Sequence, residues 1–536
     1  MSYKVRIWGP PGTGKTTYLL DRVGEELKSG VTPSQIVYTS FTKAAATEAK
    51  DRAVQQFQQE YNPSEFTNFS TIHSICFKLL GLSRDEVFAG RKLKEFCESF
   101  GYEVSDDNSD SEIGSEEELH EKVLRTDADY FEHFLNWQRN ALLTIEQAYD
   151  KFIDHNDVPD GFNMELLRLY VKRRSDYKMS NNLWDFCDML EQVIYQEIIP
   201  DDVKVIIQDE CQDWTPLLAR IAGMWAEKAE RVYMAADPYQ CIYEWMSADP
   251  SIIINTKVDK TMVLKQSYRC PVLVHDLSRE IVDRFSSRYD DDDYLPRQEQ
   301  GHIVRTVHNQ IEWNNLGDRV FYVHRTRWLL NKKIAELMRD GIPFSTLRGI
   351  KSPLQTEKAK VVNSLLRMVD NKSVTIADVV KVMDYLPSKT TTGEYLLSGS
   401  KAGAKRLAQE KSIRAISPRE LHSLGFTDLF FRFFDRQNIL EPIKMTVEEK
   451  SYFNRLVEVN GQQVLEKEPS LILSTIHGVK GKECDTLILN LDLTRKTYAA
   501  LLDNPDQEHR LFYVGVTRSK NNVIILEPED MQSYRL

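Results

Sequence analysis

The stretch Gly9-Pro10-Pro11-Gly12-Thr13-Gly14-Lys15-Thr16 begins eight residues into a chain of 536. A short alternating apolar run, residues 3–7, precedes it, and residues 17–27 carry leucine and valine at helical spacing. Strand, glycine loop and helix in this order are typical of a phosphate-binding loop, whose backbone N–H groups point at a phosphate. Lys15 supplies a charge for the β- and γ-phosphates, and the Thr16 hydroxyl can ligate magnesium. The sequence therefore predicts a nucleotide site and disfavours an accidental glycine-rich turn.

Composition sets the broad class. The length predicts two to four domains, and 41% apolar with 28% charged residues is ordinary for a globular protein. The seven cysteines form no Cys-x-x-Cys pair, so neither a zinc ribbon nor a disulfide framework is expected. The chain shows no apolar run of about 20 residues. We expect a cytoplasmic protein without membrane contacts, associated with the nucleoid, or in the host cytoplasm if it is viral.

The net charge of −12 is unevenly distributed. Residues 103–121 hold nine acidic residues and no Lys or Arg, and Asp290 to Asp293 add four more. Without these thirteen charges the net charge would be about +1. A locally basic groove for nucleic acid is therefore compatible with the acidity, because phosphate contacts need only a few positioned cations. We interpret 103–121 as a solvated surface loop.

An acid pair marks a second half of the nucleotide site. Residues 203–208 form a β-branched run typical of a central parallel strand, and Asp209-Glu210 follow it. Asp209 is predicted to bind magnesium, and Glu210 to position or deprotonate the attacking water. A further strand, 231–236, leads to Gln240, which can sense the γ-phosphate, and to Tyr243 and Trp245, which can offer stacking faces to bases.

Two other stretches are ambiguous by themselves. The segment 41–50 is a helix start that can receive a backbone phosphate, although an ordinary strand–helix junction is the more common case. His73, in Ser70-Thr71-Ile72-His73-Ser74, is more often structural than a ligand when taken alone.

Taken together, these segments resemble superfamily 1 helicases of the UvrD/Rep/PcrA group. Eight stretches match the family's motifs in order: 9–17 (motif I), 39–50 (Ia), 70–77 (Ib), 209–213 (II), 237–245 (III), 264–269 (IV), 474–483 (V) and 510–518 (VI). The resemblance implies an α/β fold with two RecA-like P-loop motor domains, parallel sheets flanked by helices, and mainly helical inserted subdomains. It implies domain 1A at 1–80 and 199–262, 1B at 81–198, 2A at 263–350 and 468–536, and a reduced 2B at 351–467.

The same resemblance assigns residues. It implies ATP and Mg²⁺ as ligands, with Arg269 and Arg518 as arginine fingers, Tyr268 on the adenine and Glu483 at the ribose. The implied ATP site comprises Gly9, Pro10, Pro11, Gly12, Thr13, Gly14, Lys15, Thr16, Thr17, Tyr268, Arg269, Glu483 and Arg518. The implied catalytic residues are Glu210, Lys15, Gln240, Arg269 and Arg518. The implied metal ligands are Thr16 and Asp209. The implied DNA contacts are Phe41, Thr42, His73, Tyr243, Trp245, Thr475 and His477.

The function that follows is an ATP-dependent single-stranded DNA translocase and helicase, with 3′–5′ polarity implied by the resemblance. Expected partners are single-stranded DNA and single-strand/duplex junctions, and the expected state is a monomer or weak dimer. Met246 and Gly478 depart from the family's arginine and serine. Two alternatives stay open: a translocase or remodeller without productive unwinding, and a P-loop switch ATPase with a protein partner.

Overall fold

The computed structural model describes residues 2–104, 126–155, 158, 162–286, 288–289, 293–313, 316–347, 351–387, 389–391, 393–410 and 412–536. The chain divides into two compact units. The N-terminal unit comprises Met1–Gln300 and Asn504–Thr517, and the C-terminal unit comprises Gly301–Asp503 and Arg518–Leu536. Most of the predicted acidic loop, residues 105–121, and Asp290 to Asp292 lie outside the described residues.

The N-terminal unit is built on a six-stranded sheet of order β3-β2-β4-β5-β1-β6. Its strands are β1 (Tyr3–Trp8), β2 (Ile36–Thr39), β3 (Phe69–Ser70), β4 (Val205–Gln208), β5 (Arg231–Ala236) and β6 (Lys260–Val263). Every pairing between neighbours is parallel. The predicted strands 3–7, 203–208 and 231–236 are thus confirmed, and parallel strands place the loops that follow them along one edge of the sheet.

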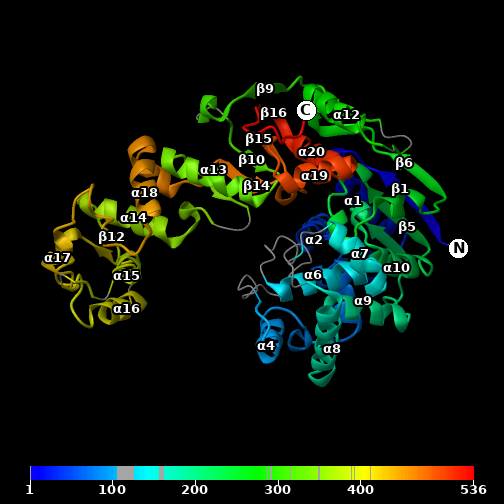
Figure 1. The fold of residues 1–536 in the computed structure, drawn as a ribbon, viewed down its shortest axis with the longest axis horizontal. Helices are drawn as coiled ribbons and strands as arrows, with labels where there is room; N and C mark the ends of the chain where they lie inside the picture. Colours follow the sequence, from blue (N-terminus) through cyan, green and yellow to red (C-terminus); the bar gives the residue numbers. More distant parts are fainter. Residues whose placement is uncertain are drawn as a thin grey trace. The chain divides into compact units, whose positions relative to one another are not determined.

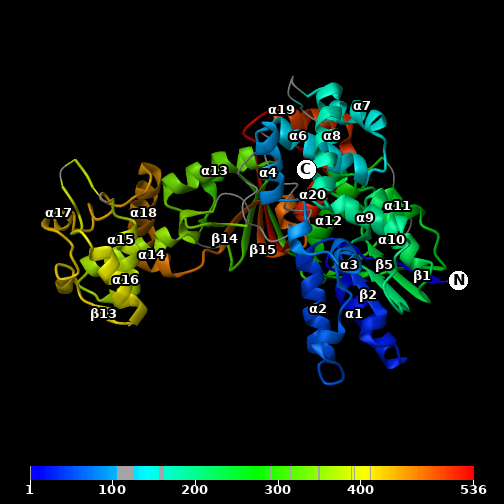
Figure 2. The ribbon, with the colours of Figure 1, turned by 90° about the horizontal axis from the view of Figure 1, so that it is seen from below.

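Helices α1 (Lys15–Lys28) and α2 (Lys43–Phe57) lie side by side against this sheet, as Figure 2 shows. Leu19, Val23 and Phe57 from these helices share a core with Ile7 and Ile207 from the strands. Helices α3 (Ile72–Leu79), α10 (Pro216–Ala226), α11 (Pro250–Asn255), α12 (Val272–Val282) and α20 (Pro505–Val516) and the strands β7 (Gln266–Pro271) and β8 (Leu295–Arg297) complete the unit around the sheet.

Between β3 and β4 the chain forms a helical insertion with a core of its own. It contains α4 (Arg91–Phe100), α6 (Asp127–Asn140), α7 (Ile145–His155), α8 (Met164–Ser180) and α9 (Phe186–Tyr195). Aromatic side chains dominate its core, with Phe96, Phe131, Phe134 and Tyr170 almost fully buried. The mainly helical character expected of this inserted subdomain is confirmed for its described residues.

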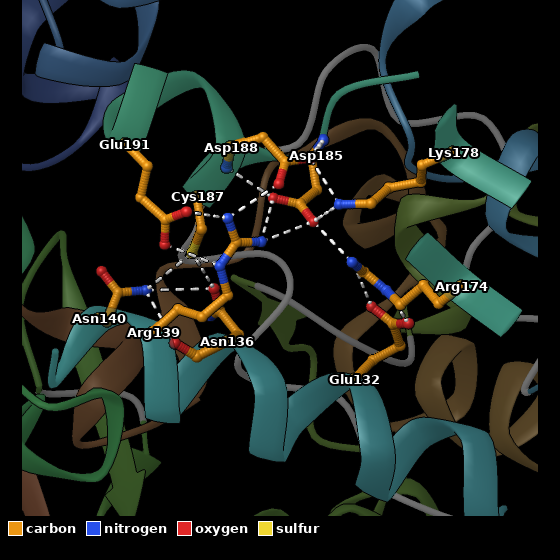
Figure 3. A network of polar contacts seen from close by, with 10 residues as sticks. All are labelled: Glu132, Asn136, Arg139, Asn140, Arg174, Lys178, Asp185, Cys187, Asp188 and Glu191. Atoms are coloured by element: carbon orange, nitrogen blue, oxygen red, sulfur yellow. Dashed lines mark hydrogen bonds and ion pairs between the residues drawn. The ribbon is translucent and has the colours of Figure 1, made fainter. Parts of the chain in front are cut away.

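A buried carboxylate, Asp185, ties three of these helices together (Figure 3). It accepts hydrogen bonds from Arg139 Nη1 on α6 at 2.9 Å and, through Oδ2, from Arg174 Nη1 at 2.6 Å and Lys178 Nζ at 2.5 Å on α8. It also caps α9 by accepting from the backbone N–H of Asp188 at 2.8 Å. Burial acts to raise the pKa of Asp185, but the three cations outweigh it and hold this pKa well below its usual range.

The C-terminal unit contains a second six-stranded sheet, of order β11-β14-β10-β15-β16-β9. Its strands are β9 (His302–Thr306), β10 (Val320–His324), β11 (Ser345–Thr346), β14 (Leu471–Thr475), β15 (Cys484–Asn490) and β16 (Ser519–Leu526), all paired in parallel. Two parallel sheets flanked by helices confirm the predicted α/β class with two RecA-like motor folds.

The segment 351–467 extends from this second sheet. It holds α14 (Glu357–Val369), α15 (Ile376–Asp384), α16 (Ser400–Glu410), α17 (Asp428–Phe431) and α18 (Val447–Asn460), with β12 (Val374–Thr375) antiparallel to β13 (Ala415–Ile416). Figure 1 shows α14 to α17 gathered away from the sheet of this unit. The helix α13 (Arg327–Asp340) packs against α18, and one continuous core runs from the sheet into these helices.

Two further findings concern the chain as described. All seven cysteines are buried free thiols, which confirms that the cysteines form no disulfide framework. Among the helices of the described residues, we find none long and apolar enough to cross a membrane.

Candidate nucleotide and nucleic-acid site

The loop between β1 and α1 requires glycine at two positions. A Cβ on Gly9 would lie 2.0 Å from Lys15 Cγ, and Gly12 has a φ of 71° with space for a Cβ blocked by Arg269 Cβ at 2.3 Å. A Cβ on Gly9 would clash with the Lys15 side chain, and the positive φ of Gly12 would strain any residue with a Cβ. Both positions therefore favour glycine. Thr13 Oγ1 donates to the carbonyl of Pro10 at 2.7 Å and tightens the turn.

Lys15 turns back over this loop. Its Nζ donates to the carbonyl oxygen of Gly9 at 2.8 Å and lies 4.0 Å from Glu210 Oε1. The side chain of Lys15 is only 10% exposed, so its charge is directed into the site. The lysine at the start of α1 and the acid at the end of β4 thus meet, as their shared sheet edge requires.

Thr16 and Asp209 form the second contact across the site. Thr16 Oγ1 donates to Asp209 Oδ2 at 2.9 Å. Burial and the neighbouring Glu210 raise the pKa of Asp209 to about 6, while Lys15 opposes the shift. Mg²⁺ at phosphate sites is bound by oxygen ligands such as hydroxyl and carboxylate groups, so Thr16 and Asp209 fit this ion.

Glu210 occupies an unusual backbone conformation. Its φ and ψ are 59° and 40°, in the left-handed region. Its N–H donates to Asp209 Oδ1 at 2.9 Å, and one carboxylate oxygen, Oε2, accepts from Gln212 Nε2. Strained non-glycine residues persist where surrounding contacts over-determine them, and such positions cluster at active sites.

The turn after β5 is organised by Asp237, which is completely buried. Its carboxylate accepts from Gln240 Nε2 at 2.7 Å and from Tyr513 OH on α20 at 3.5 Å. Its own N–H donates to Gln212 Oε1 at 3.0 Å. Burial raises the pKa of Asp237, and Lys15 opposes this shift. The structure therefore joins Gln240, a predicted site residue, to the acid pair through side chains that the prediction did not include.

The other predicted nucleotide residues are divided between the two units. In the N-terminal unit, Tyr268 is 72% exposed, and its N–H donates to the carbonyl of Gly12 at 2.8 Å. Arg269 Nη1 donates to the carbonyl of Thr517 at 3.5 Å. In the C-terminal unit, Arg518 is buried and Glu483 forms an ion pair with Lys520.

Aromatic residues predicted to face DNA lie together in the N-terminal unit. Phe41 and Tyr243 stack with ring centroids 5.2 Å apart, and Trp245 meets Tyr243 edge-on at 6.4 Å. Thr42 caps α2 by accepting from the N–H of Ala45 at 3.0 Å. Helix α2 therefore begins within the segment 41–50, and a phosphate contact at this helix start stays a prediction.

A small cavity of about 20 Å³ lies between residues predicted for DNA and the acid pair. Its lining includes Phe41 and His73 as well as Asp209, Glu210 and Ser40. The ring of His73 meets Phe186 edge-on at 6.0 Å. Residues that the sequence predicts for two different ligands thus border one space.

The remaining predicted DNA contacts lie at the end of β14 in the C-terminal unit, where Thr475 is the last residue of the strand and His477 begins the short helical turn after it. Thr475 Oγ1 accepts from the N–H of Gly478 at 3.2 Å. Sequence reasoning did not single out Gln212, Asp237 or Tyr513. Their one signal was their place inside motif-like segments, because their partners are separated from them by up to 276 residues.

Comparison with known proteins gives matches to two family models. Residues 2–261 match the UvrD/REP helicase N-terminal domain, and residues 430–528 match the UvrD-like helicase C-terminal domain. A probable DNA helicase II homolog of Mycoplasma pneumoniae is 23% identical over 98% of this chain and 82% of its own length. The putative ATP-dependent DNA helicase YjcD of Bacillus subtilis is 23% identical over 96% of this chain and 76% of its own.

The ATP-dependent DNA helicase srs2 of Schizosaccharomyces pombe is 22% identical over 96% of this chain and 69% of its own length. The matched segments contain the phosphate loop, the acid pair, the turn after β5 and the whole of α20. Fold, site geometry and family models agree, and the chain belongs to the UvrD/Rep-like helicases of superfamily 1.

Proposed function

We propose that this protein is an ATP-dependent single-stranded DNA translocase and DNA helicase. The observation that carries the proposal is the shared cavity, because Phe41 and His73 border the same space as Asp209 and Glu210. Movement of Phe41 or His73 on binding a DNA strand would change the space that the two acids border. The names of the relatives, all DNA helicases, support the same activity.

In ATP hydrolysis, we assign Lys15 to the β- and γ-phosphates and Glu210 to the attacking water. Glu210 takes the proton as the water oxygen bonds to the γ-phosphorus, and the bond from that phosphorus to the bridging oxygen breaks to leave ADP. Thr16 and Asp209 would hold magnesium, which would neutralise charge on the phosphates. Gln240 is assigned to the γ-phosphate.

Arg269 and Arg518 are assigned as the guanidinium groups that stabilise charge on the transferring phosphoryl group. Tyr268 offers an exposed ring for the adenine, and Glu483 is assigned to the ribose. The predicted domains 1A, 1B, 2A and 2B, with the boundaries given above, remain part of this proposal.

On the DNA side, Phe41, Tyr243 and Trp245 form the stacking group, since each base has a face that an aromatic ring can meet. The proposed contacts with the DNA strand are those of Thr42, His73, Thr475 and His477. We propose single-strand/duplex junctions as the DNA that the whole protein binds. We propose 3′–5′ movement, which rests on the family resemblance.

The first experiment measures ATP turnover by the purified protein with and without single-stranded DNA, beside Lys15→Ala, Glu210→Gln and Arg518→Ala. We expect single-stranded DNA to stimulate ATP turnover by the wild type, and we expect each of the three variants to lose this DNA-stimulated turnover. Turnover that is indifferent to DNA would contradict the translocase and favour a switch ATPase with a protein partner.

A second candidate is a translocase that does not unwind productively. Met246, at the position of the family's arginine, is 3% exposed and belongs to the core, so its side chain offers nothing to DNA. Unwinding of 3′-tailed and 5′-tailed duplexes, run beside displacement of streptavidin from biotinylated single strands, separates the two. Displacement without unwinding supports the second candidate, and unwinding of only 5′-tailed duplexes contradicts the polarity.

A further inference from the structure

Gln212 lies between the two halves of the hydrolytic site. Its side chain is completely buried, and it stands two residues after Glu210 in the short turn that follows β4. Its amide nitrogen donates to Glu210 Oε2 and, at 3.4 Å, to Asp213 Oδ2, and its amide oxygen accepts from the N–H of Asp237 at 3.0 Å. A carboxamide is a neutral group that donates and accepts from one rigid plane, so this side chain links the two segments at a fixed separation.

The hydrogen bond from Gln212 to Glu210 complements the ion pair between Lys15 and Glu210. Lys15 Nζ is 4.0 Å from Glu210 Oε1, whereas Gln212 bonds the other oxygen, Oε2. The two oxygens of the Glu210 carboxylate thus each face a different partner, which fixes the plane of the group. Because a general base must present one oxygen to its water, this plane decides how well Glu210 works.

The far end of the link is equally defined. Asp237 gives its N–H to Gln212 and uses its carboxylate to accept from Gln240 Nε2 at 2.7 Å and from the N–H of Tyr239 at 3.1 Å. A shift of the turn that carries Gln240 would therefore pull on Gln212 and turn the Glu210 carboxylate.

We propose that Gln212 is a positioning residue, which sets the plane of the Glu210 carboxylate and makes it depend on the position of the Asp237–Gln240 turn. The proposal rests on the hydrolytic role proposed for Glu210. It explains why an amide is buried here, where an apolar side chain of the same volume would pack without any need for partners.

Two variants separate the contacts. Gln212→Met keeps the length of the side chain and removes its hydrogen bonds with Glu210, Asp213 and Asp237. Gln212→Glu keeps an oxygen for the N–H of Asp237 but loses the donor to Glu210. We expect both variants to lower kcat of the DNA-stimulated ATPase about tenfold or more and to leave KM for ATP within about twofold, the signature of a lost transition-state interaction.

A double-mutant cycle then tests whether Gln212 acts through Glu210. In the Glu210→Gln background, Gln212→Met should leave the residual single-turnover rate unchanged. Thr215→Val is the matched control, because Thr215 is buried in the same segment, caps α10 and bonds Asn140 rather than the acids. It should lower the melting temperature and leave kcat of the folded fraction unchanged.

The outcomes are distinct. Wild-type protein without ATP turnover would overturn the proposed function and this inference with it. Active wild type with Gln212→Met within twofold of its kcat would overturn the inference alone. So would full activity of Gln212→Glu, which would show that the contact with Asp237 suffices, or an equal loss from Gln212→Met in both backgrounds, which would show a structural effect.

Discussion

Thr16 Oγ1 donates a hydrogen bond of 2.9 Å to Asp209 Oδ2 and joins the first turn of α1 to the end of β4, across 193 residues of sequence. The two oxygens belong to the two segments that the sequence predicts to share a metal. Their meeting explains why a phosphate loop at one strand end and an acid at another can act on one nucleotide.

Asp209→Asn should raise the Mg²⁺ concentration needed for half-maximal ATP turnover by tenfold or more, because a neutral amide is a poorer ligand for a hard cation. The measurement is ATPase rate against Mg²⁺ after treatment with EDTA. EDTA alone should abolish wild-type turnover, and added Mg²⁺ should restore it. An unchanged Mg²⁺ dependence in the variant would remove Asp209 from the metal site.

Lys15→Ala should lower kcat by about 100-fold or more, since removal of one preorganised group that stabilises transition-state charge typically costs 10²–10³. Lys28→Ala is the matched control, because Lys28 ends the same helix α1 on its exposed side and should leave the rate unchanged. Equal rates for the two variants would contradict the nucleotide role of the loop.

Trp245→Ala should weaken the activation of ATP turnover by single-stranded DNA, because base stacking on an aromatic ring contributes about 1–3 kcal/mol per base. We expect the DNA concentration for half-maximal activation to rise at least fivefold, with little change in turnover without DNA. Tyr195→Ala, at a ring that is 83% exposed on α9, is the control and should have no effect.

Asp185→Asn should destabilise the N-terminal unit by about 3–5 kcal/mol, the usual cost of removing one partner from a buried ion pair. In this variant the three cations lose the one carboxylate that faces all of them and keep only their ion pairs with Glu132, Asp188 and Glu191 (Figure 3). Urea or thermal unfolding measures the change, and Glu191→Gln, a half-exposed member of the same network, should cost much less.

The same network predicts acid sensitivity. The folded-state pKa of Asp185 lies below its unfolded value, so the stabilisation is complete above a pH of about 4 and is lost as the pH falls through the folded pKa. In the Asp185→Asn variant, this part of the acid dependence should disappear.

His324 predicts a second pH effect, in the C-terminal unit. Burial at the end of β10 lowers the pKa of His324 from 6.5 to about 3. The unfolded chain binds this proton near pH 6.5 and the folded chain does not, so stability should fall as the pH decreases between about 6.5 and 3. The loss is on the order of a few kcal/mol, at about 1.4 kcal/mol per pKa unit.

The melting temperature measured against pH checks this effect. His324→Gln should flatten the curve between pH 6.5 and 3, whereas His302→Gln, at an exposed position of β9, should leave it as in the wild type. A curve of unchanged slope in His324→Gln would contradict the assignment.

The local parts of the fold were predictable because each is indicated by residues that are adjacent in the sequence. The loop 9–16 and the acid pair 209–210 each follow a strand with obvious apolar patterning, and parallel pairing then brings them to one edge. The hydrogen-bonded partners of Gln212 and Asp237 were not predictable in this way. A buried amide or acid is recognised only when its partners are known, and those partners come from distant segments.

The charge network around Asp185 could not be predicted from the sequence for a related reason. Arg139, Arg174 and Lys178 lie on α6 and α8, where charged residues at helical spacing predict a solvated face. Tertiary packing buries them instead, because one carboxylate meets all three. The aromatic core of the insertion was predictable only as apolar helix faces, and the pairs of rings that meet depend on the packing angle.

The helix α20 has a consequence for how the protein is made. It belongs to the N-terminal unit, where Tyr513 bonds Asp237 and Asp506 bonds Ser286, yet in the sequence it follows the rest of that unit only after residues 301–503 of the C-terminal unit. The N-terminal half emerges first from the ribosome and lacks this helix throughout synthesis of the second sheet's first strands. Its hydrolytic turn is therefore completed only after most strands of the second sheet have been translated, so a chain terminated before residue 505 would carry the phosphate loop without the contact between Tyr513 and Asp237.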